Sequence, residues 1–223
     1  MLAAVAAIVL LHAPTPDNTL TPREVHEGWK LLFDGKTTNG WHNFKETGIH
    51  SGWEVKDGVL KSVNAGDAGD IVTNDKYDWF ELQLDYKLEK GQNSGIMFHV
   101  ADDGGATWFS GPEIQIYDDH GEEHAQKSGY LYDLYSSPVD STKPVGQWNH
   151  FRIIISPKKC ATYVNGVKYY EYVLNSPDFK ERVAKSKFHE FPQFATLPTG
   201  TICIQGDHGV VSFKNIKLKP LKG

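Results

Sequence analysis

At 223 residues, of which 39% are hydrophobic and 12% aromatic, the chain can bury one domain-sized core, which excludes a disordered protein. A net charge of −5 excludes the strongly basic surface that nucleic acids require, so no nucleic-acid partner is expected. The cysteines, Cys160 and Cys203, lack the spacing of a metal site. We interpret them as buried free thiols, with a disulfide as the alternative.

An uninterrupted apolar run from Leu2 to Leu11 opens the chain. About ten residues cannot span a hydrocarbon layer ~30 Å thick, so no membrane-spanning helix is expected, but the run matches the apolar region of a secretory signal. We therefore expect residues 1–18 to be an export segment and the protein to be periplasmic or extracellular. The alternative is a frayed N-terminal strand or helix.

Alternation of apolar and polar residues with a period of two predicts β-strands along most of the chain. From Phe80 to Glu89, apolar and polar residues alternate without a break, which predicts an antiparallel strand with one buried face. Asp57-Gly58 and Asn165-Gly166 are typical of tight hairpin turns. The expected strands and hairpins are 29–33, 53–63, 70–73, 80–89, 93–100, 111–117, 150–156, 161–169, 200–205 and 210–219.

Helical patterning is almost absent: one short helix is expected within 177–189, capped by Ser176 or Asp178. Residues 101–110 and 118–147 are rich in Gly, Asp, Ser and Pro and are expected to form long loops. Many short strands with tight turns predict an all-β fold, a two-sheet jelly-roll sandwich with one domain at 27–221. In such a sandwich the outer face of a curved sheet can hold a ligand.

The stretch 111–119 is the most informative. Successive side chains of a strand point to opposite faces, so Ile114 and Ile116 are expected in the core, while Glu113, Gln115 and Tyr117 share the other face. A carboxylate, an amide and a phenol in one row are suited to binding a small sugar. By the same rule, residues 93–100 should place Ile96, Phe98 and Val100 on one face and Met97 and His99 on the other.

Further short blocks follow one another in a fixed order along the chain. They are WKLLFDGK (29–36) with Gly40-Trp41, WEVKDG (53–58), NSGI (93–96), GPEIQI (111–116), KPVGQWN (143–149), VNG (164–166), IQGDHG (204–209) and FKNI (213–216). Together they resemble the 3-keto-disaccharide hydrolase family over about residues 27–221. The resemblance implies a concanavalin A-like lectin or glucanase fold, and an enzyme that cleaves glycosides already oxidised to a ketone at C3.

Such a ketone makes the C2 hydrogen acidic, so a base can remove it and the C1 aglycone can leave, after which water adds back. The reaction needs a base, a group that stabilises the enolate oxygen and an acid for the leaving group. Glu113 is the first candidate for acid or base, because burial can raise its pKa towards neutrality. His208 is a candidate base or proton shuttle. The alternatives are a solvated glutamate and a loop histidine that bonds locally.

The remaining candidates would contact the sugar or a metal. The expected sugar-binding residues are Gln115, His99, Asn93, Tyr117, Trp108 and Asp70. His99 stands where the family commonly has Arg, and Trp108 and Tyr117 offer rings for stacking on sugar CH groups. Asp118, with Asp119, His120 and His124 close behind, permits a divalent metal ion. Solvated loop residues are the alternative, and no other cofactor is expected.

Two other functions remain open. A lectin-like carbohydrate-binding module on the same sandwich would need the sugar contacts but no turnover. An ordinary glycosidase would need a second carboxylate about 5–10 Å from Glu113, for which Asp118 and Asp70 are the candidates.

Overall fold

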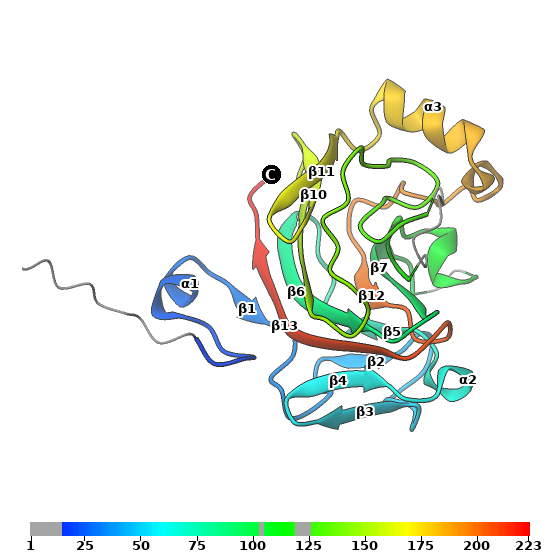
Figure 1. Ribbon diagram of the computed structural model, residues 1–223. Coiled ribbons are helices and arrows are strands. Elements are labelled where there is room, and N and C mark those ends of the chain that lie inside the picture. The colour runs from blue at the N-terminus through cyan, green and yellow to red at the C-terminus, as the bar shows by residue number, and fades with distance from the viewer. Residues whose placement is uncertain (1–14, 103–104, 119–125) are drawn as a thin grey trace, which may run out of the picture.

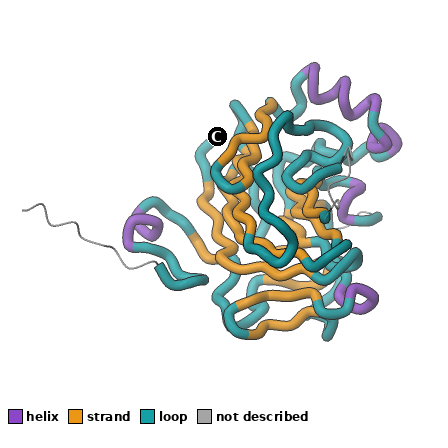
Figure 2. Tube along the Cα trace, viewed as in Figure 1, coloured by secondary structure: helices purple, strands orange, loops and turns teal. Residues whose placement is uncertain are grey.

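The computed structural model describes residues 15–102, 105–118 and 126–223. Its strands form two antiparallel sheets that pack against each other, with short helices at the periphery (Figure 1). The same view coloured by secondary structure shows strands joined by long loops (Figure 2). The predicted all-β sandwich is therefore confirmed.

The larger sheet has eight strands in the order β11-β10-β9-β6-β13-β4-β3, with β1 paired to β13. Its strands are β1 Lys30–Leu31, β3 Trp53–Lys56, β4 Val59–Ser62, β6 Phe80–Leu88, β9 Asn149–Ile155, β10 Cys160–Val164, β11 Val167–Tyr172 and β13 Val211–Pro220. The smaller sheet has the order β2-β5-β12-β7-β8. Its strands are β2 Trp41–Asn43, β5 Ile71–Thr73, β7 Asn93–Val100, β8 Glu113–Tyr117 and β12 Thr201–Ile204. Each predicted strand is present; β2 was not predicted.

The helices are short. They are α1 Pro22–His26, α2 Ala65–Ala68, α3 Pro177–Lys185 and the 3₁₀ turns η1 Thr107–Phe109 and η2 Lys187–Glu190. Ser176 caps α3 as predicted, with its hydroxyl accepting a bond of 3.2 Å from the Phe179 N–H. The expected helix is interrupted at Ser186, whose hydroxyl caps η2. No helix in the described ranges is long and apolar enough to cross a membrane.

The core lies between the two sheets. In β6 the five apolar residues predicted to share one face are all buried in it. Aromatic rings dominate its volume; Phe80, Phe151, Phe179 and Phe213 are among the largest fully buried side chains. Cys160 and Cys203 are free and buried, and they lie on strands of different sheets, as expected for isolated thiols.

A local bulge reverses the pattern of β7 at His99. This residue has a φ of +53°, and the pairing register with β12 shifts at the same place. As a result the His99 ring points into the core, with its centroid 6.4 Å from that of Phe80, and its Nε2 donates a bond of 2.7 Å to the Asp78 carbonyl. Val100 lies instead with Met97 on the outer face. The prediction that His99 shares the face of Met97 is therefore wrong, because the bulge breaks the period-two alternation.

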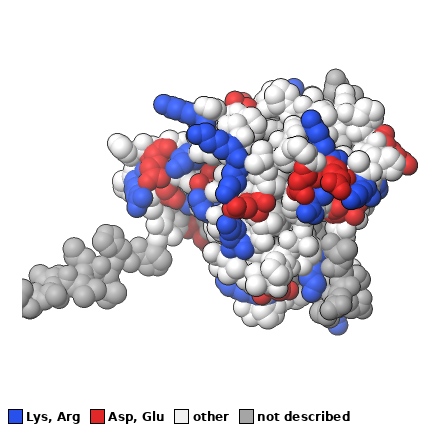
Figure 3. Space-filling view, turned by 90° about the horizontal axis from the view of Figure 1, so that it is seen from above, with Lys and Arg blue, Asp and Glu red and all other residues white. Residues whose placement is uncertain are grey.

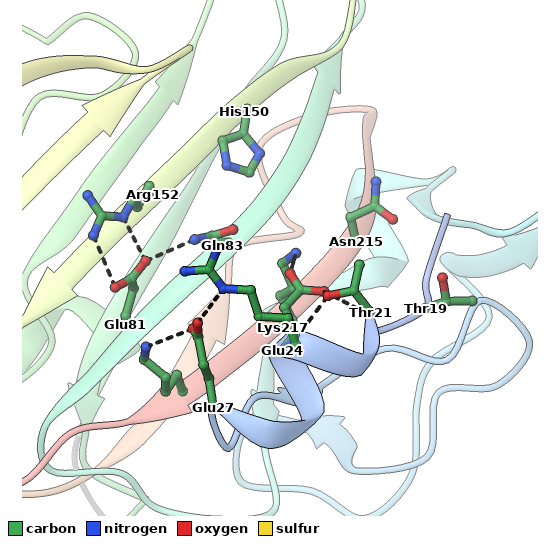
Figure 4. A network of polar contacts seen from close by, with 12 residues as sticks. Thr19, Thr21, Glu24, Glu27, Glu81, Gln83, His150, Arg152, Asn215 and Lys217 are labelled. Carbon is green, nitrogen blue, oxygen red and sulfur yellow. Dashed lines mark hydrogen bonds and ion pairs between the residues drawn. The ribbon is translucent and has the colours of Figure 1, made fainter. Parts of the chain in front are cut away.

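The outer face of the larger sheet carries a network of ion pairs (Figure 4). Arg152 donates bonds of 2.6 and 3.1 Å to the two carboxylate oxygens of Glu81, across β9 and β6. Helix α1 lies over this network, where Glu24 contacts Lys217 of β13. A bidentate guanidinium–carboxylate pair fixes the geometry of both partners, so the two strands are held in register here.

The N-terminal part of the described chain also packs on this sheet. Asn18 is 7% exposed, and its backbone N–H donates a bond of 2.6 Å to Asn215 of β13. The folded region therefore begins upstream of residue 27, where the sequence predicted the start of the domain. The predicted export segment falls largely on residues 1–14, outside the described residues.

Figure 3 shows positive and negative side chains interspersed over one face of the molecule.

Gly200 sits where β12 approaches the His99 bulge. A Cβ at this position would lie 2.4 Å from the His99 carbonyl carbon and 2.7 Å from the Val100 oxygen, both backbone atoms. We expect Gly200→Ala to lower the free energy of unfolding by about 1–3 kcal/mol, because the strands must separate to admit the methyl group. Urea denaturation measures the change.

Gly66→Ala is the matched control. Its Cβ would meet only the Asn64 side chain, at an ordinary 3.5 Å, within helix α2. We expect this variant to be as stable as the wild type or slightly more so. Equal stability of the Gly200→Ala variant and the wild-type protein would contradict the close approach at the bulge.

Candidate active site

Strand β8 places its polar residues on the outer face of the smaller sheet. Ile114 and Ile116 are buried in the core between the sheets, as predicted. Glu113 and Gln115 alternate with them and therefore lie on the opposite face, where Glu113 remains 8% exposed. The predicted division of this strand between a core face and a polar face is confirmed.

Strand pairing brings further polar residues into line with these two. Cys203 pairs with Val72 and with Met97, and Met97 pairs with Glu113. One step along, Gln115 pairs with Gly95, whose carbonyl accepts a bond of 3.0 Å from the N–H of Gln205. The outer face thus has two neighbouring rows across β5, β12, β7 and β8. The first row is Val72, Cys203, Met97 and Glu113; the second is Gln205, Gly95 and Gln115. Asp70, directly before β5, continues the second row if the register of Ile204 with Ile71 is extended by one residue.

The side chain of Glu113 extends from the first row over Gly95, which belongs to the second row. A Cβ on Gly95 would be 2.2 Å from Glu113 Oε1 and 2.7 Å from its Cδ. The absence of a side chain at residue 95 therefore makes the space that the carboxyl group occupies. This assigns a structural role to the glycine of the Asn93-Ser94-Gly95-Ile96 block.

Asp70 is a second, partly buried carboxylate at this face. It accepts a bond of 2.6 Å from the Thr107 hydroxyl of η1 and one of 3.2 Å from the Gly206 N–H. Burial raises the pKa of Asp70 to about 6, against these bonds, which favour the ionised form. The negative charge of Asp207 raises it further.

Glu113 has a still higher pKa. Burial raises it to about 7, and the negative charge of Asp70 adds to the increase. The positive charges of Lys187 and His208 act in the opposite direction. Two carboxyl groups that influence each other and titrate near neutrality can exchange protons with a ligand at physiological pH, which is a common property of catalytic sites.

His208 lies in the turn between β12 and β13 and is partly exposed. Its Nδ1 pairs with the carboxylate of Asp207, and this hydrogen bond raises the pKa of the imidazole. The charges of Glu113 and Asp70 act on the same group. The structure therefore brings together three of the residues predicted from the sequence: Glu113, Asp70 and His208.

Several residues of this region were not predicted. Lys187 of η2 holds its ammonium group 4.2 Å from the centroid of the Tyr132 ring. Gln205 lies in the second row, and its buried amide oxygen has no hydrogen-bond partner among the described residues. Thr107 orients Asp70. Only Gln205, inside the Ile-Gln-Gly-Asp-His-Gly block, carried a signal in the sequence. Thr107 and Lys187 lie in the 3₁₀ turns η1 and η2, and Lys187 is far from Glu113 along the chain.

The other predicted sugar-binding residues have varied positions. Gln115 is buried, and its amide oxygen accepts a bond of 2.9 Å from the Ile116 N–H. Trp108 packs on the outer face beside the cluster that contains Met97. Asn93 pairs with Tyr117 at the far end of β7 and β8, where Tyr117 lines a separate cavity of about 270 Å³. His99 points into the core, away from this face, and is not part of the site.

The predicted metal site cannot be assembled from the described residues. Asp118 accepts a bond of 2.7 Å from the Gly91 N–H, while residues 119–125, which include the neighbouring candidates, lie outside the described ranges. Within those ranges, no three His, Cys, Asp or Glu residues form a group that could hold a metal ion. Metal binding at Asp118 stays a prediction.

Comparison with known proteins gives a consistent picture. Residues 28–219 match the family described as 3-keto-alpha-glucoside-1,2-lyase-like domain. A 3-keto-disaccharide hydrolase from Bacteroides thetaiotaomicron is 30% identical over 230 residues, covering 87% of this chain and 79% of the relative. A Parabacteroides distasonis crystal structure is 32% identical and covers 93% of this chain and 100% of its own, with a TM-score of 0.83. A carbohydrate-binding module from Bacillus subtilis, 14% identical over 80% of this chain and 94% of its own, shares the fold at a TM-score of 0.51.

The space above Gly95 can be tested by filling it. We expect Gly95→Ala to displace the Glu113 carboxyl group towards solvent, so that the pKa of Glu113 falls by at least about one unit towards its ordinary value. A carboxyl-carbon NMR titration measures this pKa directly. Gly66→Ala again serves as the control, and a Glu113 pKa that stays near 7 in Gly95→Ala would contradict the contact.

The raised pKa also predicts a pH dependence of stability. Between the ordinary pKa of 4.5 and the folded value of about 7, the folded state binds more protons than the unfolded state, so stability falls as pH rises through this window. Glu113→Gln lacks this group. We expect the variant to become more stable than the wild type above pH 7, by up to about 3 kcal/mol, and to lose the advantage near pH 4.5. Denaturation curves across this range check the sign; a constant difference between the two proteins would contradict it.

Proposed function

The chain belongs to the 3-keto-alpha-glucoside-1,2-lyase-like domain family, and from that premise we propose that it hydrolyses 3-keto-disaccharides by elimination followed by hydration. The observation that supports this most directly is the pair of carboxyl groups on the outer face of the smaller sheet, buried Glu113 and partly buried Asp70. Their pKa values are raised to about 7 and about 6. The curated relative is named for hydrolysis of 3-keto-disaccharides.

Glu113 is assigned the role of base. The C3 ketone makes the C2 hydrogen acidic, and a carboxylate with a pKa near 7 is a stronger base than an ordinary glutamate while remaining largely ionised at slightly alkaline pH. The C–H electron pair becomes an enolate, which then expels the C1 substituent and leaves an enone. Addition of water at C1 and return of the proton to C2 complete a net hydrolysis.

His208 is assigned the role of acid for the departing aglycone. Its bond to Asp207 favours the protonated imidazolium near neutral pH. Its position in a partly exposed turn leaves room for an aglycone of variable size. Asp70 and Gln205 would bind sugar hydroxyls, because a hydroxyl can donate to the unpartnered amide oxygen of Gln205.

The decisive assay compares 3-keto-trehalose and 3-keto-sucrose with the unoxidised sugars. We expect turnover of the keto sugars only, because the unoxidised sugars lack the acidic C2 hydrogen. Glu113→Gln should lower kcat by about 10²–10⁴-fold, the usual contribution of a general base. Glu54→Gln, which changes an exposed glutamate on β3, is the matched control and should retain full activity.

Three outcomes would count against the proposal. Equal rates on keto and unoxidised sugars would indicate an ordinary glycosidase. Binding without turnover, unchanged in Glu113→Gln, would indicate a carbohydrate-binding module. Full activity of Glu113→Gln would exclude Glu113 as the base. A parallel assay after thorough chelation tests the predicted divalent metal, since an unchanged rate would exclude a required ion.

A further inference from the structure

Lys187 has an unusual environment for a cation beside a sugar-binding face. Its ammonium group lies over three aromatic rings, 4.2 Å from the centroid of Tyr132, 5.3 Å from Phe188 and 5.4 Å from Trp108. Ring faces stabilise the positive charge, yet they accept none of its hydrogen bonds in the way that an oxygen would. The residue is exposed, so these donors are accessible to a ligand.

Three other lysines that lie over rings, all of them on β13, have a carboxylate partner as well, whereas Lys45 over Phe44 and Lys87 over Trp148 have none among the described residues. Lys217 and Lys219 both lie over Trp29, and they pair with glutamates of α1 or the residue after it. Lys214 lies over Trp148 and pairs with Asp17 at 2.7 Å. Lys187 likewise makes no ion pair with any residue that the structure describes, and it lies over three rings rather than one. Its ammonium donors are therefore left for an oxygen that this part of the chain does not supply.

The position of Lys187 relative to Glu113 follows from the turn that contains Tyr132. Tyr132 donates its backbone N–H to the Glu113 carbonyl at 2.9 Å, so the ring that carries the ammonium group belongs to the residue bonded to Glu113. Trp108, the second ring, packs against the outer-face cluster that contains Met97, the pairing partner of Glu113. The charge of Lys187 also opposes the rise in the Glu113 pKa, as expected of a cation facing the same space.

We propose that Lys187 binds the C3 oxygen of the keto sugar and stabilises the enolate, an inference that rests on the proposed function. When Glu113 takes the C2 proton, the C–H pair forms the C2=C3 bond and the carbonyl π pair moves to O3, where the ammonium group donates a hydrogen bond. Re-forming the C3 carbonyl then drives the pair into C1=C2 as the C1–O bond breaks. Lys187 keeps its proton throughout.

The same contact serves the second half of the reaction. Water adding to C1 of the enone pushes an electron pair back to O3, so the enolate forms again before C2 regains its proton. The ammonium group therefore stabilises both enolate-forming steps from one position. The ammonium group also favours keto sugars over unoxidised sugars. Negative charge develops on O3 of the ketone during the reaction, whereas the 3-hydroxyl of an unoxidised sugar develops none.

The test separates enolate formation from departure of the aglycone. In D₂O, 3-keto-1,5-anhydroglucitol has no leaving group at C1, so exchange of its C2 hydrogen reports the first step alone. We expect Lys187→Met, which keeps an apolar stem over the rings, to lower both this exchange and kcat on 3-keto-trehalose by about 10²–10³-fold. Lys187→Arg should restore part of both rates. Lys180→Met removes an exposed charge from the neighbouring helix α3 and should match the wild type.

A pH profile adds an independent readout. The cation favours ionised Glu113, so loss of the Lys187 charge should raise the pKa of this carboxyl group. The acidic limb of the kcat/KM profile, on which activity rises as Glu113 ionises, should therefore move to higher pH. Wild-type exchange or wild-type turnover in Lys187→Met would overturn the inference while leaving the proposed function intact. Inactivity of the wild-type protein on keto sugars would instead remove the proposed function, and the role of Lys187 with it.

Discussion

Placing a carboxyl group against the outer face of a sheet is the constraint on which the rest of this site depends. Glu113 fits there because Gly95, on the neighbouring strand, has no side chain. Removing the carboxyl group from water raises its pKa to about 7. A single close contact between strands thus converts an ordinary glutamate into a group that can accept a proton from a carbon acid.

The scaffold around this contact is held together by the core between the sheets and by contacts on the outer face of the larger sheet. The aromatic core packs between the two sheets, and the Glu81–Arg152 pair and helix α1 lie on part of the outer face of the larger sheet. Catalytic groups held on paired strands keep their positions better than groups on loops. Glu113 is therefore held by β8, while Asp70 at the start of β5 is oriented by Thr107.

Loops supply what the sheet does not. His208 comes from the β12–β13 turn, Lys187 from η2 and Trp108 from η1, three segments distant in sequence that approach the same face. The resulting division gives a buried carboxyl group on the sheet and exposed cations at its margin. This arrangement suits a reaction in which negative charge develops on an oxygen while a proton leaves carbon.

The sequence by itself determined the sandwich and the two faces of β8, because period-two alternation requires only local geometry and burial. It also indicated Glu113 and His208, whose short blocks carry chemically distinctive side chains, and Asp70, which stands at the start of a predicted strand. The orientation of His99 was decided by the tertiary structure, through a bulge that alternation cannot reveal. The same is true of Lys187, which reaches the face because η2 packs over Tyr132. Contacts between distant segments depend on packing, and no local pattern encodes them.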